Sequence, residues 1–241
     1  MSNKTGTIED AVIYSKELEE EIELLVYLPA NFSPLYKYAL LIAQDGKDYF
    51  QLGRIPRVAD QLLEEEEIED LIIVGVPYRN VEDRWEKYHP DGSKQGAYIR
   101  FLAHELVPFL EERYPLHNVS HGRGLAGDSL AATVSLIAAL QYPHTFGKVI
   151  MHSPHVDDKV MNAVEQAEEY KHLSLYHVIG LEETEVVRTN GQVDDFLSPN
   201  RALHDLLYQK GFDMFYEEFE GGHSWKYWQP DLKRALSMIF E

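Results

Sequence analysis

The sequence contains no cysteine among its 241 residues, which excludes disulfide bonds, thiolate nucleophiles and cysteine-based metal sites. It also has no apolar run that approaches the length of a membrane-spanning helix. Its first ten residues, MSNKTGTIED, lack the apolar core of a signal peptide. We therefore expect a cytoplasmic protein that does not insert into a membrane.

Positive charge is scarce. The chain has 22 Lys and Arg residues against 41 Asp and Glu residues, and its net charge is -19 at pH 7. A field of this sign repels nucleic acids and anionic membrane surfaces, so we expect neither as a partner. The sequence leaves homo-oligomer formation open.

Repeats, low-complexity tracts and linkers are also missing, while 44% of the residues are apolar, enough for a sizeable core. We therefore expect one domain over residues 1–241.

Short segments rich in β-branched and aromatic residues alternate with helical patterns along most of the chain. The first two strand candidates are separated only by the polar stretch KELEE, which predicts an antiparallel hairpin. The alternation that follows predicts an α/β fold with a mostly parallel central sheet and helices on both faces. The strand candidates are TIEDAVIYS, EIELLVYLP, YALLIAQDG, DLIIVGVPY, GLAGDS, KVIMHSP, LSLYHVIG and DMFYEEFEGG, and the helical patterns lie at 58–68, 98–110, 130–140, 201–208 and 231–240.

The stretch RGLAGDSLAA around Ser129 has two incompatible interpretations. It contains the GDSL letters of one lipase superfamily, but that superfamily carries them near its first strand and pairs them with a late Asp-x-x-His, which this sequence lacks. As a nucleophile elbow, Gly127 and Ala131 provide the small flanks that a sharp turn from strand to helix requires. This interpretation fits better, although Ala131 replaces the usual glycine. A helix N-cap serine remains the simpler alternative.

A nucleophilic serine needs a base and an acid, which hydrolases of this topology take from later strand ends in the order serine, acid, histidine. His223 is the only histidine in a glycine-rich loop beyond the last strand candidate. For the acid we favour Glu183, three positions after Gly180. The other acids in the same interval remain alternatives: Glu182, Glu185, Asp194 and Asp195.

Five motifs together resemble the Putative esterase family of α/β-hydrolases, which contains esterase D, the enterochelin esterases and the feruloyl and acetyl-xylan esterases. They are LLIAQDGKDYF, FLAHELVPFLEERYP, RGLAGDSLAA, GLEE and FEGGHSWKYW. The resemblance covers about residues 22–240 and is most specific in GGHSWKYW.

The resemblance implies a serine carboxylic-ester hydrolase with the α/β-hydrolase fold, a small-molecule ester as substrate, and no metal or organic cofactor. By position, Ser129 matches the nucleophile, His223 the base and Glu183 the acid. One oxyanion N–H would come from Leu130 and the second from Gly46 or Lys47. Ala131 and a glutamate acid depart from the commoner pattern.

Three further residues are candidate substrate contacts. Arg84 belongs to the segment PYRNVEDRWEKYHP, which combines cationic and aromatic side chains after a strand end; a surface loop with no binding role explains it equally well. His152, in MHSPHVDD with His155, is expected to line the pocket rather than to bind a metal. Trp225 lies next to His223, where it would form the floor of a pocket or pack the last helix.

The sequence thus predicts a serine esterase that forms an acyl-enzyme. An acyltransferase on the same fold and a binding protein that has lost turnover are the alternatives, the second motivated by Ala131 and the ambiguous acid. The sequence does not show the acyl group or the alcohol.

Overall fold

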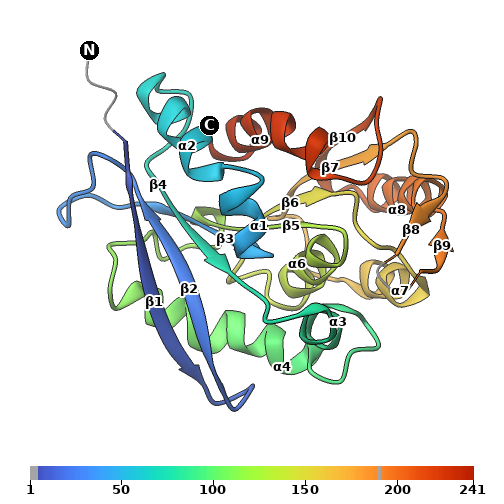
Figure 1. The fold of residues 1–241 in the computed structure, drawn as a ribbon, viewed down its shortest axis with the longest axis horizontal. Helices are drawn as coiled ribbons and strands as arrows, with labels where there is room; N and C mark the ends of the chain where they lie inside the picture. Colours follow the sequence, from blue (N-terminus) through green and yellow to red (C-terminus); the bar gives the residue numbers. More distant parts are fainter. Residues whose placement is uncertain (1–4, 189–190) are drawn as a thin grey trace.

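The computed structural model of the chain describes residues 5–188 and 191–241. An eight-stranded sheet runs through it in the order β1-β2-β4-β3-β5-β6-β7-β10, as Figure 1 shows. The strands from β4 to β10 pair in parallel, whereas β1 pairs with β2, and β2 with β4, in antiparallel orientation. The predicted α/β-hydrolase fold with an N-terminal hairpin is confirmed. The strands are β1 (Thr7–Ser15), β2 (Glu20–Leu28), β3 (Ala39–Gln44), β4 (Leu71–Val76), β5 (Arg123–Asp128), β6 (Lys148–His152), β7 (Ser174–Gly180) and β10 (Asp213–Phe219).

The central strands β3, β4, β5 and β6 are buried along their whole length because helices cover both faces of the sheet. Every residue of β3 and β4 is buried, as expected for parallel strands inside an α/β sheet. In β2, buried and exposed side chains alternate over much of the strand, and most of β1 is exposed at the edge. The segments with continuous apolar runs therefore mark the centre of the sheet.

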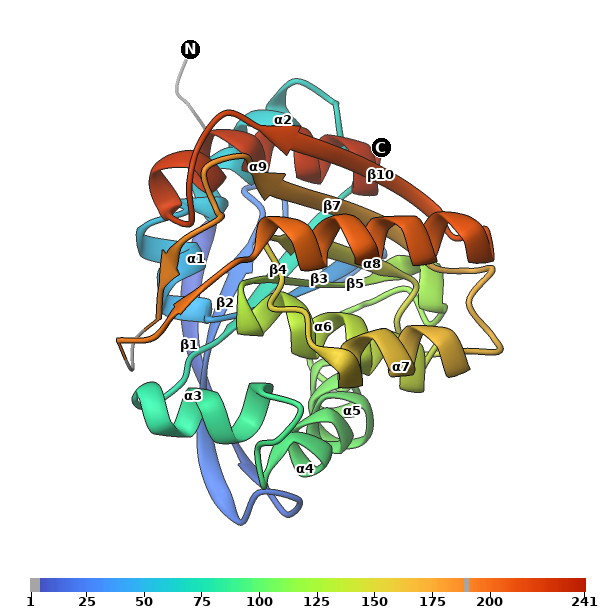
Figure 2. The same ribbon diagram turned by 90° about the vertical axis from the view of Figure 1, so that its right-hand side faces the viewer.

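Helices pack on the two faces as two separate groups (Figure 2). On one face, α1, α2 and α9 form an apolar core with the sheet, and on the other face α3 to α8 do so. The helices are α1 (Gly46–Gln51), α2 (Ile55–Glu64), α3 (Val81–Tyr88), α4 (Gln95–Arg100), α5 (Val107–Glu111), α6 (Leu130–Gln141), α7 (Asp158–Gln166), α8 (Leu197–Lys210) and α9 (Trp225–Phe240). A π-helical turn at Phe101–Leu106 joins α4 to α5, so the helical pattern predicted over 98–110 is continuous but not uniformly α-helical.

Two segments differ from the prediction. The segment PYRNVEDRWEKYHP is mostly helix α3 rather than a loop, because the Asn80 side chain accepts a hydrogen bond from the Asp83 N–H and caps the helix. Between β7 and α8 lies an unpredicted two-stranded hairpin, β8 (Val186–Val187) with β9 (Val193–Asp194). Among the described helices, none is long and apolar enough to cross a membrane.

Candidate active site

Ser129 occupies a strained turn between β5 and α6. Its backbone has φ 52° and ψ -124°, a conformation that side chains other than glycine rarely adopt. A Cβ atom on Gly127 would lie only 2.1 Å from the carbonyl carbon of Ala131, so glycine is required there. The Ser129 side chain makes no capping hydrogen bond to α6. This geometry fits a nucleophile elbow and not an N-cap.

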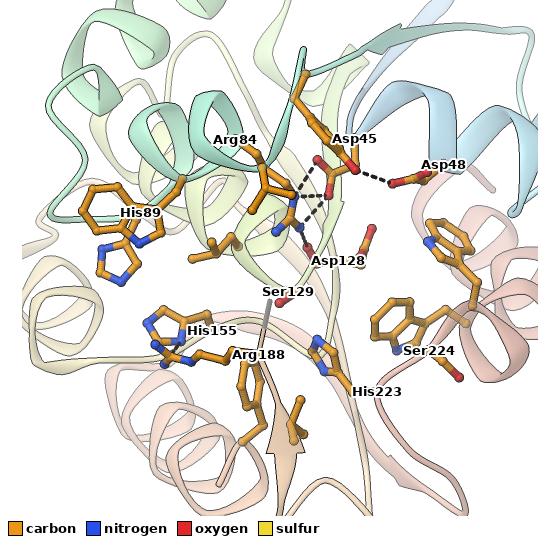
Figure 3. Close-up of a pocket in the computed structure, with 18 of the residues that line it drawn as sticks. Asp45, Asp48, Arg84, His89, Asp128, Ser129, His155, Arg188, His223 and Ser224 are labelled. Atoms are coloured by element: carbon orange, nitrogen blue, oxygen red, sulfur yellow. Dashed lines mark hydrogen bonds and ion pairs between the residues drawn. The ribbon is translucent and has the colours of Figure 1, made fainter. Parts of the chain in front are cut away.

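Ser129 opens into a cavity of about 1090 Å³ at the carboxyl ends of the parallel strands. Figure 3 shows Ser129 in the middle of this cavity, with His223 on one side and Arg84, Asp45 and Asp128 on another. Polar and apolar side chains both line it. The apolar part consists of Leu52, Val81, Trp85, Leu130, Val186, Val187, Phe196, Trp225 and Trp228.

Glu183 is fully buried and accepts a hydrogen bond from His223, whose Nδ1 lies 2.7 Å from its Oε2. The neighbouring candidates Glu182 and Glu185 are exposed. Asp194 pairs with Arg188, and Asp195 accepts a hydrogen bond from the Ser198 N–H. Of the five acids that the sequence offered, Glu183 is therefore the one that contacts the histidine.

Ser153, which the sequence did not single out, helps to hold Glu183 in place. Its Oε1 accepts from the Ser153 hydroxyl at 2.6 Å and from the Gly180 N–H at 2.9 Å. The indole N–H of Trp228 in turn donates to Ser153 Oγ at 3.1 Å. The buried carboxylate is thus compensated by three hydrogen bonds, and Trp228 fixes the serine that supplies one of them.

Ser129 and His223 face the same cavity but are not joined by a hydrogen bond within 3.5 Å. In free enzymes this contact is often long and shortens when a substrate binds. The arrangement therefore leaves His223 Nε2, opposite the bond to Glu183, as the nitrogen available to the serine.

The predicted oxyanion donors lie at two helix N-termini. Leu130 is the first residue of α6 and lines the cavity, and Gly46 and Lys47 are the first two residues of α1. The first N–H groups of a helix have no partner within it. Gly46 and Lys47 do not line the cavity themselves, but Asp45 and Asp48 on either side of them do. Both assignments stay predictions.

Arg84 forms hydrogen bonds to two segments that line the cavity, one at Asp45 and one at Asp128. Its guanidinium makes a bidentate contact with the carboxylate of Asp45, at 2.6–3.0 Å, and donates to the Asp128 carbonyl oxygen at 3.3 Å. Burial would lower the pKa of Arg84, but the Asp45 carboxylate outweighs it and raises the pKa. Arg84 is thus placed at the cavity, as predicted, with most of its hydrogen-bonding capacity used by the protein.

Asp128, which directly precedes Ser129, is a buried carboxyl group with a different environment. Its Oδ1 has no hydrogen-bond partner among the described residues. Burial and the nearby Asp45 carboxylate raise the pKa of Asp128 well above its ordinary value, although Arg84 opposes them. Burial and Asp45 also raise the pKa of Asp48 on α1.

The prediction for Trp225 agrees with its position, and that for His152 does not. Trp225 lines the cavity and packs edge-on against Tyr49, with ring centroids 4.8 Å apart. His152 is fully buried on the α9 side of the sheet, where its Nε2 contacts Asp231 at 3.0 Å, so it does not line the cavity. His155 lines the cavity instead. Its backbone N–H donates to the Ser129 carbonyl oxygen at 3.2 Å.

A group of three described residues has the composition of a metal site. One ring nitrogen each of His89 and His155 and a carboxylate oxygen of Asp157 lie within 4.8 Å of one another. Both histidines already accept an N–H at Nδ1, His89 from the Asp91 backbone at 3.0 Å and His155 from Arg188 at 3.1 Å. Metal-bound histidines normally donate through the second nitrogen, so these bonds disfavour metal binding.

Known proteins of similar sequence or structure include a bacterial relative and two esterases of known structure. The Bacillus subtilis protein YjcH is 55% identical over 239 residues, covering 99% of this chain and 100% of YjcH. A ferulic acid esterase structure aligns with a TM-score of 0.81 at 19% identity, covering 98% of both chains. The enterobactin esterase FES of Shigella flexneri aligns with a TM-score of 0.83 at 17% identity, covering 97% of this chain and 58% of the esterase. At these identities the two structures show a shared fold.

The profile of the family described as Putative esterase matches residues 15–239, nearly the whole chain. The fold, the cavity at the carboxyl ends of the strands and this match agree with one another. The chain belongs to the Putative esterase family, and this membership supports an esterase-type hydrolase function.

Proposed function

We propose that the protein is a serine carboxylic-ester hydrolase in which Ser129 is the nucleophile, His223 the general base and Glu183 the acid that orients the base. The 2.7 Å contact between His223 Nδ1 and buried Glu183, in the cavity that also holds the strained Ser129, is the observation that carries this proposal. A small-molecule ester is the substrate, and no cofactor takes part in the steps.

The reaction follows from the position of each group. Because Glu183 accepts a hydrogen bond from Nδ1, the neutral His223 carries its proton there, and Nε2 is free to take the proton of Ser129. Ser129 Oγ then attacks the ester carbonyl carbon, and the N–H of Leu130 with that of Gly46 or Lys47 stabilises the oxyanion. His223 returns the proton to the leaving alcohol, which departs and leaves an acyl-enzyme.

In the second half of the reaction, His223 takes a proton from water, and the resulting hydroxide attacks the acyl carbonyl. Collapse of the second tetrahedral intermediate releases the acid and gives the proton back to Ser129. If an alcohol or thiol took the place of water, the same acyl-enzyme would support acyl transfer.

The test uses purified protein, a fluorophosphonate probe and 4-nitrophenyl esters with short and long acyl chains. We expect the wild type to be labelled and to hydrolyse at least one ester. The Ser129→Ala variant should lose labelling and at least about 10³-fold in kcat/KM, with nearly unchanged thermal stability, because the hydroxyl acts as a chemical group and makes no packing contact. Ser237→Ala, on the surface of α9, is the matched control and should behave like the wild type.

The outcomes separate the candidate functions. Labelling without hydrolysis of any ester favours acyl transfer. Absence of labelling means that Ser129 is not activated and favours a binding protein.

A further inference from the structure

The cluster of His89, His155 and Asp157 is not used by the proposed reaction, although its two histidines line the same cavity as Ser129. Figure 3 shows His89 and His155 on one side of Ser129, with Arg188 beside His155. Their rings lie 5.1 Å apart, and the Trp85 ring stacks on His89 with centroids 4.8 Å apart. The two imidazoles are thus held by packing as well as by hydrogen bonds.

The hydrogen bonds determine where each neutral imidazole carries its proton. An arginine can only donate, so Nδ1 of His155 must accept from Arg188. Nδ1 of His89 accepts from the Asp91 N–H. A neutral imidazole has one N–H, and in both residues it must therefore be on Nε2. Both histidines offer an Nε2–H donor.

Both histidines are neutral at neutral pH. Burial lowers the pKa of His155 to about 4, with help from Arg188 and His89. Burial also lowers the pKa of His89, although Asp157 and Asp91 oppose the change. The cluster thus combines two neutral N–H donors with the carboxylate of Asp157, which accepts hydrogen bonds and also caps α7 through the Val160 N–H.

The three side chains come close without satisfying one another. Their nearest polar atoms lie within 4.8 Å, yet no two of the three are joined by a hydrogen bond within 3.5 Å. A ligand atom placed against both Nε2–H groups and the Asp157 carboxylate would accept two hydrogen bonds and donate one. A hydroxyl group does this, since its oxygen has two lone pairs and carries one proton. A divalent cation would need free Nε2 lone pairs, and a carboxylate ligand would be repelled by Asp157.

We propose that His89, His155 and Asp157 form a subsite that binds a hydroxyl group of the ester substrate. The proposal rests on the proposed function and adds a substrate class to it, namely hydroxylated esters. The subsite and Ser129 belong to the same cavity, and the backbone N–H of His155 donates to the Ser129 carbonyl oxygen, so the two chain segments are adjacent. The hydroxyl would therefore be carried near the ester bond, by the alcohol part or by the acyl part.

The test compares matched esters with and without a hydroxyl group. Glycerol monoacetate is paired with propyl acetate to probe the alcohol part, and methyl 3-hydroxybutyrate with methyl butyrate to probe the acyl part. The measured quantity is the ratio of kcat/KM within each pair. Damage to the fold lowers both members equally and leaves the ratio unchanged. We expect the wild type to prefer the hydroxylated member of at least one pair by about tenfold or more.

Substitutions test which residues cause the preference for the hydroxylated ester. His155→Phe and His89→Phe should bring the ratio of the preferred pair towards one, because the ring is kept but the donor is lost. His155→Gln should retain part of the ratio, because its amide N–H reaches a similar position. His144→Phe, which changes an exposed histidine elsewhere, is the control and should keep the full ratio.

Three results would overturn the subsite. In the first, the wild type hydrolyses both members of each pair with a ratio near one, which leaves the proposed function intact. In the second, the ratio survives both phenylalanine variants. In the third, calorimetry with Zn²⁺ shows tight binding that His155→Phe abolishes, which would make the cluster a metal site. Failure to hydrolyse any ester would instead contradict the proposed function, and the subsite with it.

Discussion

Two buried carboxyl groups lie beside the elbow, and their surroundings differ. Glu183 is compensated by His223, Ser153 and the Gly180 N–H. Asp128 directly precedes Ser129, but one of its carboxyl oxygens has no partner among the described residues, and burial raises its pKa. A short distance to the serine along the chain therefore does not identify the acid. What distinguishes Glu183 is that hydrogen-bond donors surround its carboxyl group and that one of these donors is the imidazole of His223.

The largest effect on activity is expected when the Glu183 carboxyl group is replaced by an uncharged amide of the same shape. Glu183→Gln should lower kcat/KM roughly 10²- to 10⁴-fold, because the amide cannot stabilise the imidazolium and holds the wrong tautomer. Glu182→Gln and Glu185→Gln, at exposed neighbouring positions, are the controls and should stay near wild type. Kinetics on one 4-nitrophenyl ester decide the matter, and full activity of Glu183→Gln would remove this residue from the mechanism.

The next largest effect is expected on stability, when Arg84 is replaced. Arg84→Met leaves Asp45, which is 1% exposed, without its partner, and should lower the free energy of unfolding by about 3 kcal/mol. Urea unfolding followed by circular dichroism measures this loss. Arg79→Met removes an arginine that is 59% exposed and should cost no more than about 1 kcal/mol. Equal losses in the two variants would mean that the Arg84–Asp45 pair contributes no more than a surface ion pair.

A smaller effect is expected from Ser153, which supports Glu183 without lining the cavity. Ser153→Ala removes one of three hydrogen bonds to the carboxylate and leaves the Trp228 N–H without its acceptor. We expect kcat to fall roughly tenfold, by the free energy of about one hydrogen bond, with KM unchanged. A rise in KM at constant kcat would show instead that Ser153 affects substrate binding.

The smallest effect on activity is expected at Asp128. Asp128→Asn should keep kcat/KM within about threefold, since the carboxyl group has no role in the proposed steps. The pH dependence of stability should change. With a raised pKa, the folded wild type binds more protons than the unfolded chain, so its stability falls as the pH rises above the ordinary carboxyl pKa towards the folded value. The asparagine variant should lack this fall, as urea unfolding over a pH series will show.

The sequence predicts the order of elements well because the signals are local. The strand candidates chosen from short segments rich in β-branched and aromatic residues match every strand of the main sheet, and small residues around Ser129 indicate the elbow. His223 and Glu183 could be proposed because this topology requires a histidine and an acid at late strand ends. The sequence favoured Glu183 over Glu182 only by its position after Gly180, and the contact between Glu183 and His223 is seen only in the structure.

The sequence could not show features that depend on the direction of a side chain or on contacts between residues far apart in the chain. His152 and His155 are equally plausible in MHSPHVDD, but His152 ends β6 with its side chain on the α9 face. The pairing of Arg84 with Asp45 joins residues 39 positions apart. The helix cap at Asn80 could have been predicted from the sequence, because Asn followed by Asp at the third position is a common helix start. This signal would have identified α3.

The backbone of Ser129 has a consequence for how such a chain evolves. A non-glycine residue at positive φ with this ψ costs on the order of 1–3 kcal/mol, a substantial part of the stability of an ordinary domain. Glycine would relieve that cost, so selection for stability alone would remove the serine. A lineage that no longer needed a reactive hydroxyl at this turn would therefore be expected to lose the serine side chain early and to keep the fold.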